Sequence, residues 1–457
     1  MNFSKKIKTF LVPFFVLMSI NTFAQNYQPN WESLDKRHTP QWYAQAKFGI
    51  FLHWGIYSVP AWATNSNADG FGSNYAEWYW QRLFAPNLKI HKEFVAFHDS
   101  VYGKNFHYPD FAQKFTCELF NPNQWAQLFK DAGAKYVVLT SKHHDGFCLW
   151  PSAQSWNWNS VDVVPHKDLA GMLTIAVKNA GLHMGFYYSL YKWFNPVYKK
   201  DVNKYVEERM LPQMKDLVSR YKPDVLWTDG EWEQTSKTWR SEEFLAWLYN
   251  ESPSKETIAV NDRWGNDTKG KHGGFQTSEY GLGTISGNKA WEETRGIGQS
   301  FGYNRNENLN EYASSEELVY ELISTVARGG NLLLNVGPAA DGTIPVIMQQ
   351  RLIDIGNWLK VNGEAIYETT AWKNAPAVTK ETSLYFTKKG ENIFAISTKW
   401  KKELVVKNIG KPKALTMLGY KGQINYRYKN STLFITVPQL TPDIIPCQYA
   451  WTFKIEQ

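Results

Sequence analysis

Short apolar runs alternate with amphipathic segments along most of the chain, from about residue 41 to residue 363. The apolar runs predict buried strands at 47–55, 134–143, 181–189, 224–227, 257–262 and 331–338. Apolar residues at helical spacing predict helices at 122–132, 169–179, 202–221, 242–250, 315–330 and 346–363. Strands that alternate with helices in this way form parallel βα units.

The number of βα units favours a (β/α)8-type barrel, an α/β fold, over an open doubly wound sheet. The glycine fingerprint of dinucleotide-binding sheets does not follow the first strand. Its nearest match, GLGTISG at 281–287, has Ser286 where the third glycine should be. After about Ala365 the pattern changes to short alternating segments with polar turns, which predict an antiparallel β-sandwich. We therefore expect a barrel domain over 27–364 and a β-sandwich domain over 365–457.

Residues 1–24 have the composition of a secretory signal peptide. Lys5, Lys6 and Lys8 precede an apolar stretch, and the small residue Ala24 marks a cleavage site. The apolar stretch is shorter than the ~20 residues that a membrane span requires, and no later stretch could cross a bilayer. We therefore expect an exported protein, periplasmic or secreted after cleavage near Ala24.

Composition and charge narrow the function classes. The chain holds 21 Trp, 25 Tyr and 26 Phe, an aromatic excess that suits sugar binding as well as a large core. The net charge of +7 falls to +4 without the three leader lysines, and no Lys/Arg run marks a nucleic-acid site. Three widely spaced cysteines, Cys117, Cys148 and Cys447, argue against a disulfide framework and against a cysteine-metal site.

Polar residues stand at the carboxyl ends of five predicted strands, where a barrel carries its active site. They are His53-Trp54, His143-His144-Asp145, Tyr187-Tyr188, Asp229 and Asn261-Asp262-Arg263. Cleavage of a glycosidic bond needs two carboxyl groups, which a retaining enzyme sets ~5–5.5 Å apart. One stays ionised, with help from a nearby Arg or His, and the other donates a proton to the leaving oxygen. Asp229, directly after an apolar run, is a candidate for the first role.

Several blocks of the chain resemble the α-L-fucosidases of glycoside hydrolase family 29, which include the animal lysosomal enzyme. In order, over roughly 41–370, they are KFGIFLHWGIYSVPAWA, NYAEWYW, YVVLTSKHHDGFCLWPS, LWTDGEW, VNDRWG, HGGF, WEETRGIGQSFGYN and GGNLLLNVGP. The resemblance implies a barrel followed by a β-sandwich. It also implies a retaining exo-α-L-fucosidase that acts by double displacement through a covalent fucosyl-enzyme, on fucosylated oligosaccharides or glycoconjugates. Family members are often oligomeric, so a homo-oligomer is possible.

The resemblance assigns roles to individual residues and makes Asp229 the nucleophile. It implies that the sugar hydroxyls are held by His53, Glu77, Trp78, His143 and His144. Tyr188 and Trp227 would lie near the reacting carbon, and Arg263 near the nucleophile. Phe301 would hold the C5 methyl group, and Trp232 would cover the site. The family takes its acid/base from a variable loop. Glu279 in QTSEYG is the first choice and Glu292 in AWEETRG the second.

Other functional interpretations of the sequence compete with that of a fucosidase. A metal site at His143-His144-Asp145 is disfavoured because adjacent side chains of a strand point to opposite faces, so we expect neither metal nor cofactor. G-x-S-x-G at 298–302 is followed by the polar, irregular stretch YNRNENLNEY and not by the apolar helix that a serine hydrolase needs after this motif. A non-catalytic fucose-binding protein would keep the sugar contacts and lose a catalytic carboxylate. A transfucosidase would use the same residues as the hydrolase.

Overall fold

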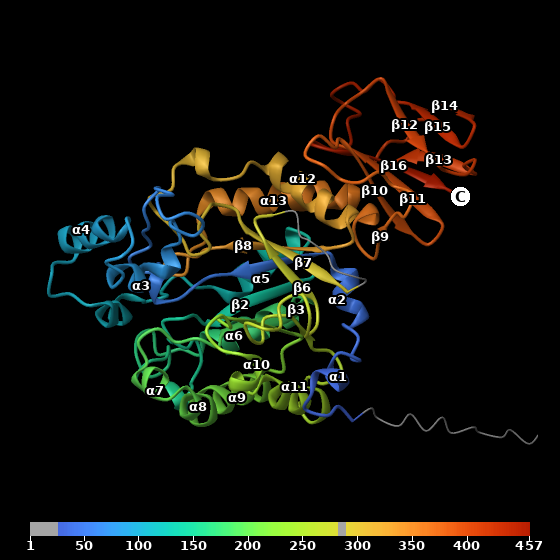
Figure 1. Ribbon diagram of the computed structural model, residues 1–457. Coiled ribbons are helices and arrows are strands. Elements are labelled where there is room, and N and C mark those ends of the chain that lie inside the picture. Colours follow the sequence, from blue (N-terminus) through green and yellow to red (C-terminus); the bar gives the residue numbers. More distant parts are fainter. Residues whose placement is uncertain (1–25, 282–288) are drawn as a thin grey trace, which may run out of the picture.

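The computed structural model describes residues 26–281 and 289–457, and its larger part is built on one eight-stranded parallel sheet (Figure 1). The strands are β1 (Phe48–Leu52), β2 (Tyr136–Lys142), β3 (His183–Ser189), β4 (Val225–Asp229), β5 (Ala259–Val260), β6 (Gln276–Glu279), β7 (Trp291–Gly296) and β8 (Asn331–Val336). Their order is β5-β4-β3-β2-β1-β8-β7-β6. This is the circular order of a barrel, with the seam between β5 and β6 joined by a single bridge, Asn261 to Phe275. The predicted barrel-type fold is confirmed.

Helices cover the outside of the sheet, and the six predicted from spacing are present. They correspond to α5 (Pro122–Asp131), α6 (Leu169–Asn179), α8 (Val202–Tyr205) with α9 (Leu211–Tyr221), α11 (Ser241–Asn250), α12 (Ser315–Ala327) and α13 (Val346–Asn362). The stretch 202–221 is not one α-helix, because a π-helical turn at Val206–Met210 separates α8 from α9. Pro212, in the first turn of α9, has no N–H to continue the α-helical ladder.

Further helices lie before β1 and in the longer connections. They are α1 (Trp31–Leu34), α2 (Gln41–Ala46), α3 (Tyr79–Leu83), α4 (His91–Val101), α7 (Pro196–Lys200) and α10 (Ser236–Trp239). No helix among the described residues is long and apolar enough to cross a membrane. The expected signal peptide at 1–24 lies outside the described residues, as does most of the GLGTISG segment.

The strands β6 and β7 depart from the predicted pattern. Neither is an apolar run: β6 reads QTSE and β7 reads WEETRG, so hydrophobicity alone did not reveal β6. Among the described residues, no helix follows β5 or β6 before the next strand. The chain there forms loops, and Gly273 and Gly274 pass so close to Val260 and Asn261 that a Cβ atom would overlap their carbonyl oxygens.

The barrel interior is filled by large side chains from alternate strand positions. Phe51, Tyr136, Tyr187, Trp227 and Leu333 belong to this cluster. The space is so limited that a Cβ atom on Gly49 would lie 2.4 Å from the Tyr136 ring. Residues two apart on a strand point to the same side, so the positions above these core residues face the barrel mouth.

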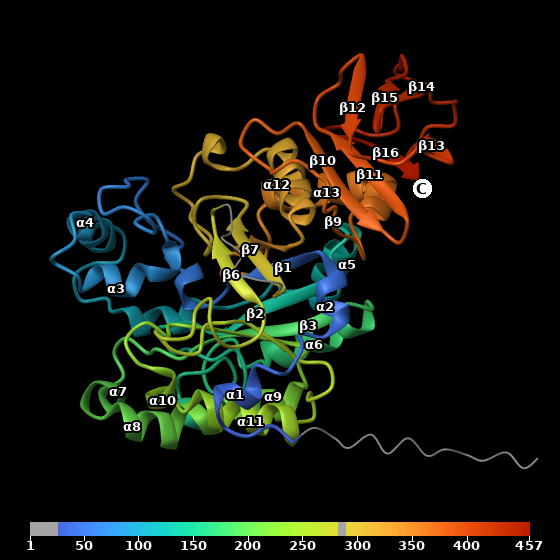
Figure 2. The ribbon, with the colours of Figure 1, turned by 45° about the vertical axis from the view of Figure 1, so that its right-hand side comes forward.

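The C-terminal region forms two antiparallel sheets with their own apolar core, as predicted. The strands are β9 (Thr370–Ala371), β10 (Leu384–Lys389), β11 (Asn392–Ser397), β12 (Glu403–Lys407), β13 (Ala414–Met417), β14 (Tyr426–Lys429), β15 (Thr432–Thr436) and β16 (Trp451–Glu456). Both ribbon views show them packed beside α12 and α13 (Figures 1 and 2). Trp358 of α13 donates its indole N–H to Ala450 O at 2.8 Å. This region therefore supports the helix layer behind β7 and β8.

Candidate active site

A cavity of about 760 Å³ opens at the carboxyl ends of the barrel strands. Most of the residues singled out from the sequence line it: His53, Glu77, Trp78, His143, His144, Trp227, Asp229, Trp232, Arg263, Glu279 and Phe301. These residues come from segments up to 248 positions apart, and the barrel brings them together at one rim.

 His53 and Phe301 mark the two ends of that range. The cavity has the size of a site for a small ligand.

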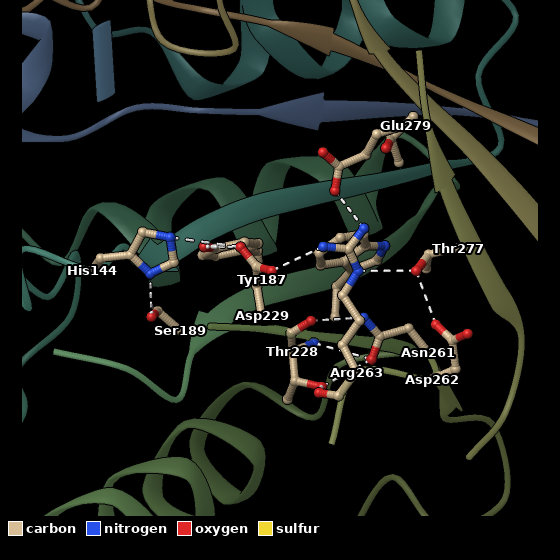
Figure 3. A network of polar contacts seen from close by, with 12 residues as sticks. His144, Tyr187, Ser189, Thr228, Asp229, Asn261, Asp262, Arg263, Thr277 and Glu279 are labelled. Carbon is tan, nitrogen blue, oxygen red and sulfur yellow. Dashed lines mark hydrogen bonds and ion pairs between the residues drawn. The ribbon is translucent and has the colours of Figure 1, made fainter. Parts of the chain in front are cut away.

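Asp229 ends β4 and is held by three neighbours, as Figure 3 shows. Its Oδ2 accepts a hydrogen bond from the Tyr187 hydroxyl at 2.8 Å and lies 3.7 Å from His144 Nε2. Its Oδ1 accepts from Arg263 at 3.0 Å. Burial raises the pKa of Asp229, but the Arg263 charge and the Tyr187 hydrogen bond outweigh it, and the net pKa is lowered. The carboxyl group is therefore ionised, with one face toward the cavity.

Arg263 lies between two carboxylates and is fixed from behind. One guanidinium nitrogen donates to Asp229 and another pairs with Glu279. Its Nε donates to the Thr277 hydroxyl at 2.9 Å, and Thr277 donates to Asp262 at 2.9 Å (Figure 3). The guanidinium carbon also lies 4.7 Å from the centre of the Trp227 ring. Both acidic partners raise the pKa of Arg263 against the opposing effect of burial, so the charge is permanent.

The two acid/base candidates lie at different depths. Glu279 ends β6, lines the cavity, and has a side chain that is 24% exposed. Glu292, near the start of β7, is fully buried and does not line the cavity. It accepts hydrogen bonds from Tyr43 at 2.6 Å, Tyr136 at 2.5 Å and the Trp227 indole at 2.9 Å. Burial raises the pKa of Glu292 to about 7, with those donors opposing the shift. The structure thus brings Glu279, and not Glu292, to the rim.

Two histidines on the cavity wall have their tautomers set by a second hydrogen bond. Ser189 donates its hydroxyl proton to Tyr191 O at 2.7 Å, so it accepts from His144 Nδ1 at 2.6 Å. Asn335 is oriented by its donation to Phe301 O at 2.6 Å, so its Oδ1 accepts from His53 Nδ1 at 2.7 Å. Burial lowers the pKa of both histidines to about 4. Each neutral ring therefore keeps an Nε2 lone pair that can accept a hydrogen bond from a hydroxyl group.

His143 differs because its buried Nδ1 has no hydrogen-bond partner among the described residues. The neighbouring Asp145 does not join it: its Oδ2 accepts from Tyr108 at 2.8 Å. The described residues contain no group of three or more His, Cys, Asp or Glu side chains placed to hold a metal ion. His143 Nδ1 is a polar atom that a bound hydroxyl would satisfy.

Glu77 and Trp78 form another side of the cavity. Glu77 Oε2 accepts from the Gly302 N–H at 2.7 Å and lies 3.3 Å from Ser300 Oγ, and burial raises the pKa of Glu77 to about 7. The Trp78 ring lies 5.8 Å from that of Trp232, which is 42% exposed at the rim. Ser300 of the G-x-S-x-G match donates to Gly302 O at 2.7 Å, so its proton is directed at backbone.

The apolar corner of the cavity is built around Phe301. Its ring stacks on His53 at 4.9 Å and meets the edges of Tyr75 at 5.3 Å and Tyr280 at 5.5 Å. Phe51 and Trp227, whose ring centres lie 5.3 Å apart, continue the apolar surface toward Asp229. A methyl group in this corner would contact aromatic carbon on several sides.

Tyr188 does not line the cavity, contrary to the prediction. Its hydroxyl donates to Gln213 at 2.8 Å, outside the barrel, and its neighbour Tyr187 lines the cavity and binds Asp229. The reason is the alternation of side chains along β3: Tyr187 pairs in register with Trp227, and Tyr188 with Thr228. Trp227 and Asp229 share a face of β4, so the same alternation could have identified Tyr187 from the sequence.

Comparison with known proteins places the chain in one family. The family model described as "Alpha-L-fucosidase" matches residues 15–364, and "Alpha-L-fucosidase C-terminal domain" matches residues 378–456. The chain is 43% identical to tissue alpha-L-fucosidase of Rattus norvegicus, over 94% of this chain and 92% of the relative. It is 46% identical to alpha-L-fucosidase of Dictyostelium discoideum, over 79% of each chain.

The chain is also similar to a solved structure. The crystal structure of Thermotoga maritima alpha-fucosidase in complex with fucose superposes with a TM-score of 0.80 at 39% identity, covering 94% of this chain and all of that one. The match extends over both the barrel and the C-terminal sheets.

Proposed function

Because the chain belongs to the α-L-fucosidase family and is a glycoside hydrolase that releases α-L-fucose, we propose that it is a retaining exo-enzyme with Asp229 as nucleophile and Glu279 as acid/base. The observation that carries this proposal is the single guanidinium of Arg263, which contacts both carboxylates at the rim of the cavity. A retaining glycosidase needs two carboxyl groups near one another, one ionised and one able to exchange a proton.

The nucleophile role of Asp229 rests on its charge and position. Its lowered pKa keeps it ionised, and Arg263 and Tyr187 hold its oxygens in place. In the proposed first step, an Asp229 oxygen attacks the anomeric carbon of fucose while the bond to the leaving oxygen breaks. The product is a fucosyl ester of Asp229, and a water molecule then attacks the same carbon and releases the carboxylate.

The acid/base role of Glu279 rests on its access to solvent and to the cavity. It must donate a proton to the leaving oxygen in the first step and take one from water in the second. Its partly exposed side chain can exchange protons with solvent, whereas Glu292 is enclosed by Tyr43, Tyr136 and Trp227. Glu279 is therefore our choice over Glu292.

Recognition of fucose follows from the cavity wall. Neutral His53 and His144 can accept hydrogen bonds from the sugar hydroxyls. Glu77 and Trp78 supply further polar contacts. Phe301 and its aromatic neighbours form the surface for the C5 methyl group. We also propose that the protein is exported and acts on terminal fucose of oligosaccharides or glycoconjugates.

The test combines product stereochemistry with one substitution. Hydrolysis of an aryl α-L-fucoside is followed by proton NMR, and we expect α-L-fucose as the first-formed anomer. Asp229→Asn should lower kcat/KM by about three orders of magnitude or more, with a chelator control on the wild-type enzyme. First-formed β-L-fucose would refute the retaining mechanism. Full activity in Asp229→Asn would refute the assignment of the nucleophile. A wild-type protein that binds fucose without turnover would instead support the non-catalytic alternative.

A further inference from the structure

A second, smaller cavity lies close to the candidate active site and has three aromatic rings in its wall. Its volume is about 210 Å³, and Trp80, Trp158 and Phe194 line it. The Trp80 ring centre lies 4.5 Å from that of Phe194 and 6.2 Å from that of Trp158. Sites for drug-sized ligands have volumes of roughly 300–1,000 Å³, so this cavity suits a single small ring. Aromatic faces are the surfaces on which large apolar groups, including sugar C–H faces, pack.

Two charged groups also line this cavity, and the first is a carboxylate. Asp145 is 3% exposed, and its oxygens accept hydrogen bonds from the Tyr108 hydroxyl at 2.8 Å and the Phe147 N–H at 3.1 Å. A carboxylate has about four lone-pair positions, so acceptor capacity remains for a ligand hydroxyl.

The second charged group is the ammonium of Lys192. Among residues 26–281 and 289–457, nothing forms a hydrogen bond or ion pair with its Nζ. Its stem passes directly over Gly146: a Cβ atom there would lie 2.0 Å from Lys192 Cε, and Gly146 has φ +78°. Burial lowers the pKa of Lys192, and Cys148 and Asp145 partly oppose that shift. A partly buried ammonium with three free donor positions is a group that a ligand can satisfy.

Neighbouring segments of the chain connect the linings of the two cavities. Trp78 lines the active-site cavity, and Trp80, two residues later, lines the second one. Trp193, between Lys192 and Phe194, packs on Trp78 at 5.1 Å and donates its backbone N–H to His144 O at 3.0 Å. The second cavity therefore lies beside the active-site cavity.

We propose that this second cavity is a non-catalytic site for one neutral pyranose unit. Ring hydroxyls would accept from Lys192 and donate to Asp145, while a C–H face packs against Trp80 and Phe194. An anionic sugar would meet the Asp145 carboxylate, and a purely apolar ligand would leave Lys192 unpaired. The choice of a sugar as ligand rests on the proposed fucosidase function.

The test measures binding and does not depend on catalysis. Saturation-transfer NMR is recorded with D-galactose, N-acetyl-D-glucosamine or D-glucuronate as probe, on Asp229→Asn protein, and the transfer that is lost in Lys192→Met is assigned to the second cavity. We expect transfer to a neutral probe, and at least tenfold weaker binding in Lys192→Met and in Phe194→Ala. The matched control is Lys199→Met, because Lys199 lies 5.0 Å from the Phe194 ring but does not line the cavity.

Three results would overturn the proposal: no transfer to either neutral sugar, transfer to glucuronate alone, or undiminished transfer in Lys192→Met. Lys192→Met keeps the aliphatic stem over Gly146 and decides the question if Phe194→Ala does not fold. A failed catalytic assignment at Asp229 would leave all these results interpretable, because none of them uses turnover.

Discussion

The mouth and the interior of the barrel each hold a glutamate on the same face of neighbouring strands. Glu279 of β6 pairs in register with Thr294 of β7, and Glu292 pairs with Thr277, two residues earlier on each strand. Two residues along a strand amount to ~6.6 Å, so Glu292 lies one layer deeper. At the mouth, Glu279 faces the cavity beside Arg263, whereas Glu292 is enclosed by Tyr43, Tyr136 and Trp227.

This difference of one layer separates two kinds of chemistry. A carboxyl group at the mouth can exchange its proton with water and meet a leaving oxygen. A carboxyl group in the interior can only organise its donors, and Glu292 holds the Trp227 indole beneath Arg263. Residue type and raised pKa are therefore not enough to identify an acid/base; depth in the barrel also decides.

The strongest test of this comparison is Glu279→Gln. We expect kcat/KM to fall by ~10²–10⁴ for a glycan substrate, because its leaving oxygen needs a proton. An aryl fucoside with a good leaving group should lose much less in the first step. Parallel kinetics on both substrates provide the measurement, and an equal loss on both would contradict the acid role.

Glu292→Gln is the matched variant in the interior. We expect it to change the ratio of kcat/KM on the glycan to kcat/KM on the aryl fucoside less than Glu279→Gln does. Its folded pKa of about 7 exceeds the unfolded value of about 4.3, so the folded state binds more protons. The wild-type free energy of unfolding should therefore fall as the pH rises from about 4.3 to 7. Denaturant titrations should show a weaker decline in the variant; an unchanged pH slope would refute this assignment.

Substitution of Arg263 by methionine should disturb both carboxylates at the mouth. The Arg263 charge lowers the Asp229 pKa, so its loss should raise that pKa. Asp229 acts only when ionised, and the acidic limb of the kcat/KM profile should move to higher pH. A profile that falls in height without shifting would contradict the electrostatic role.

Tyr187→Phe and Tyr188→Phe compare the two faces of β3. Loss of the Tyr187 hydrogen bond to the Asp229 carboxylate should cost ~1.5–3 kcal/mol, or roughly ten- to a hundredfold in kcat/KM. Tyr188→Phe should leave kcat/KM near the wild-type value and lower the melting temperature, because Gln213 loses a donor. A reversed pattern would contradict the placement of these side chains.

The smallest expected effect concerns the apolar corner. Phe301→Ala should reduce the preference for an α-L-fucoside over an α-L-galactoside, its 6-hydroxylated analogue, by ~1–3 kcal/mol. The ratio of the two kcat/KM values measures this preference. An unchanged ratio would mean that Phe301 does not contact the methyl group.

Sequence patterns were sufficient for the strands with apolar runs, such as β1, β2 and β8, and for the helices with a regular apolar face. They did not reveal β6, because QTSE is polar and contains no apolar run. The C-terminal strands were recognisable because hydrophobic alternation is itself the signature of a sheet with one buried face.

The sequence by itself determined the fold class, the family and the polar residues at the strand ends, because alternation and motif spacing are local properties of the chain. Only the tertiary structure decided that Tyr187 and not Tyr188 faces Asp229, that Glu279 lies at the mouth and Glu292 one layer below, and that Arg263 joins two carboxylates. These depend on the register between neighbouring strands, and a shift of one residue would turn each side chain to the opposite face.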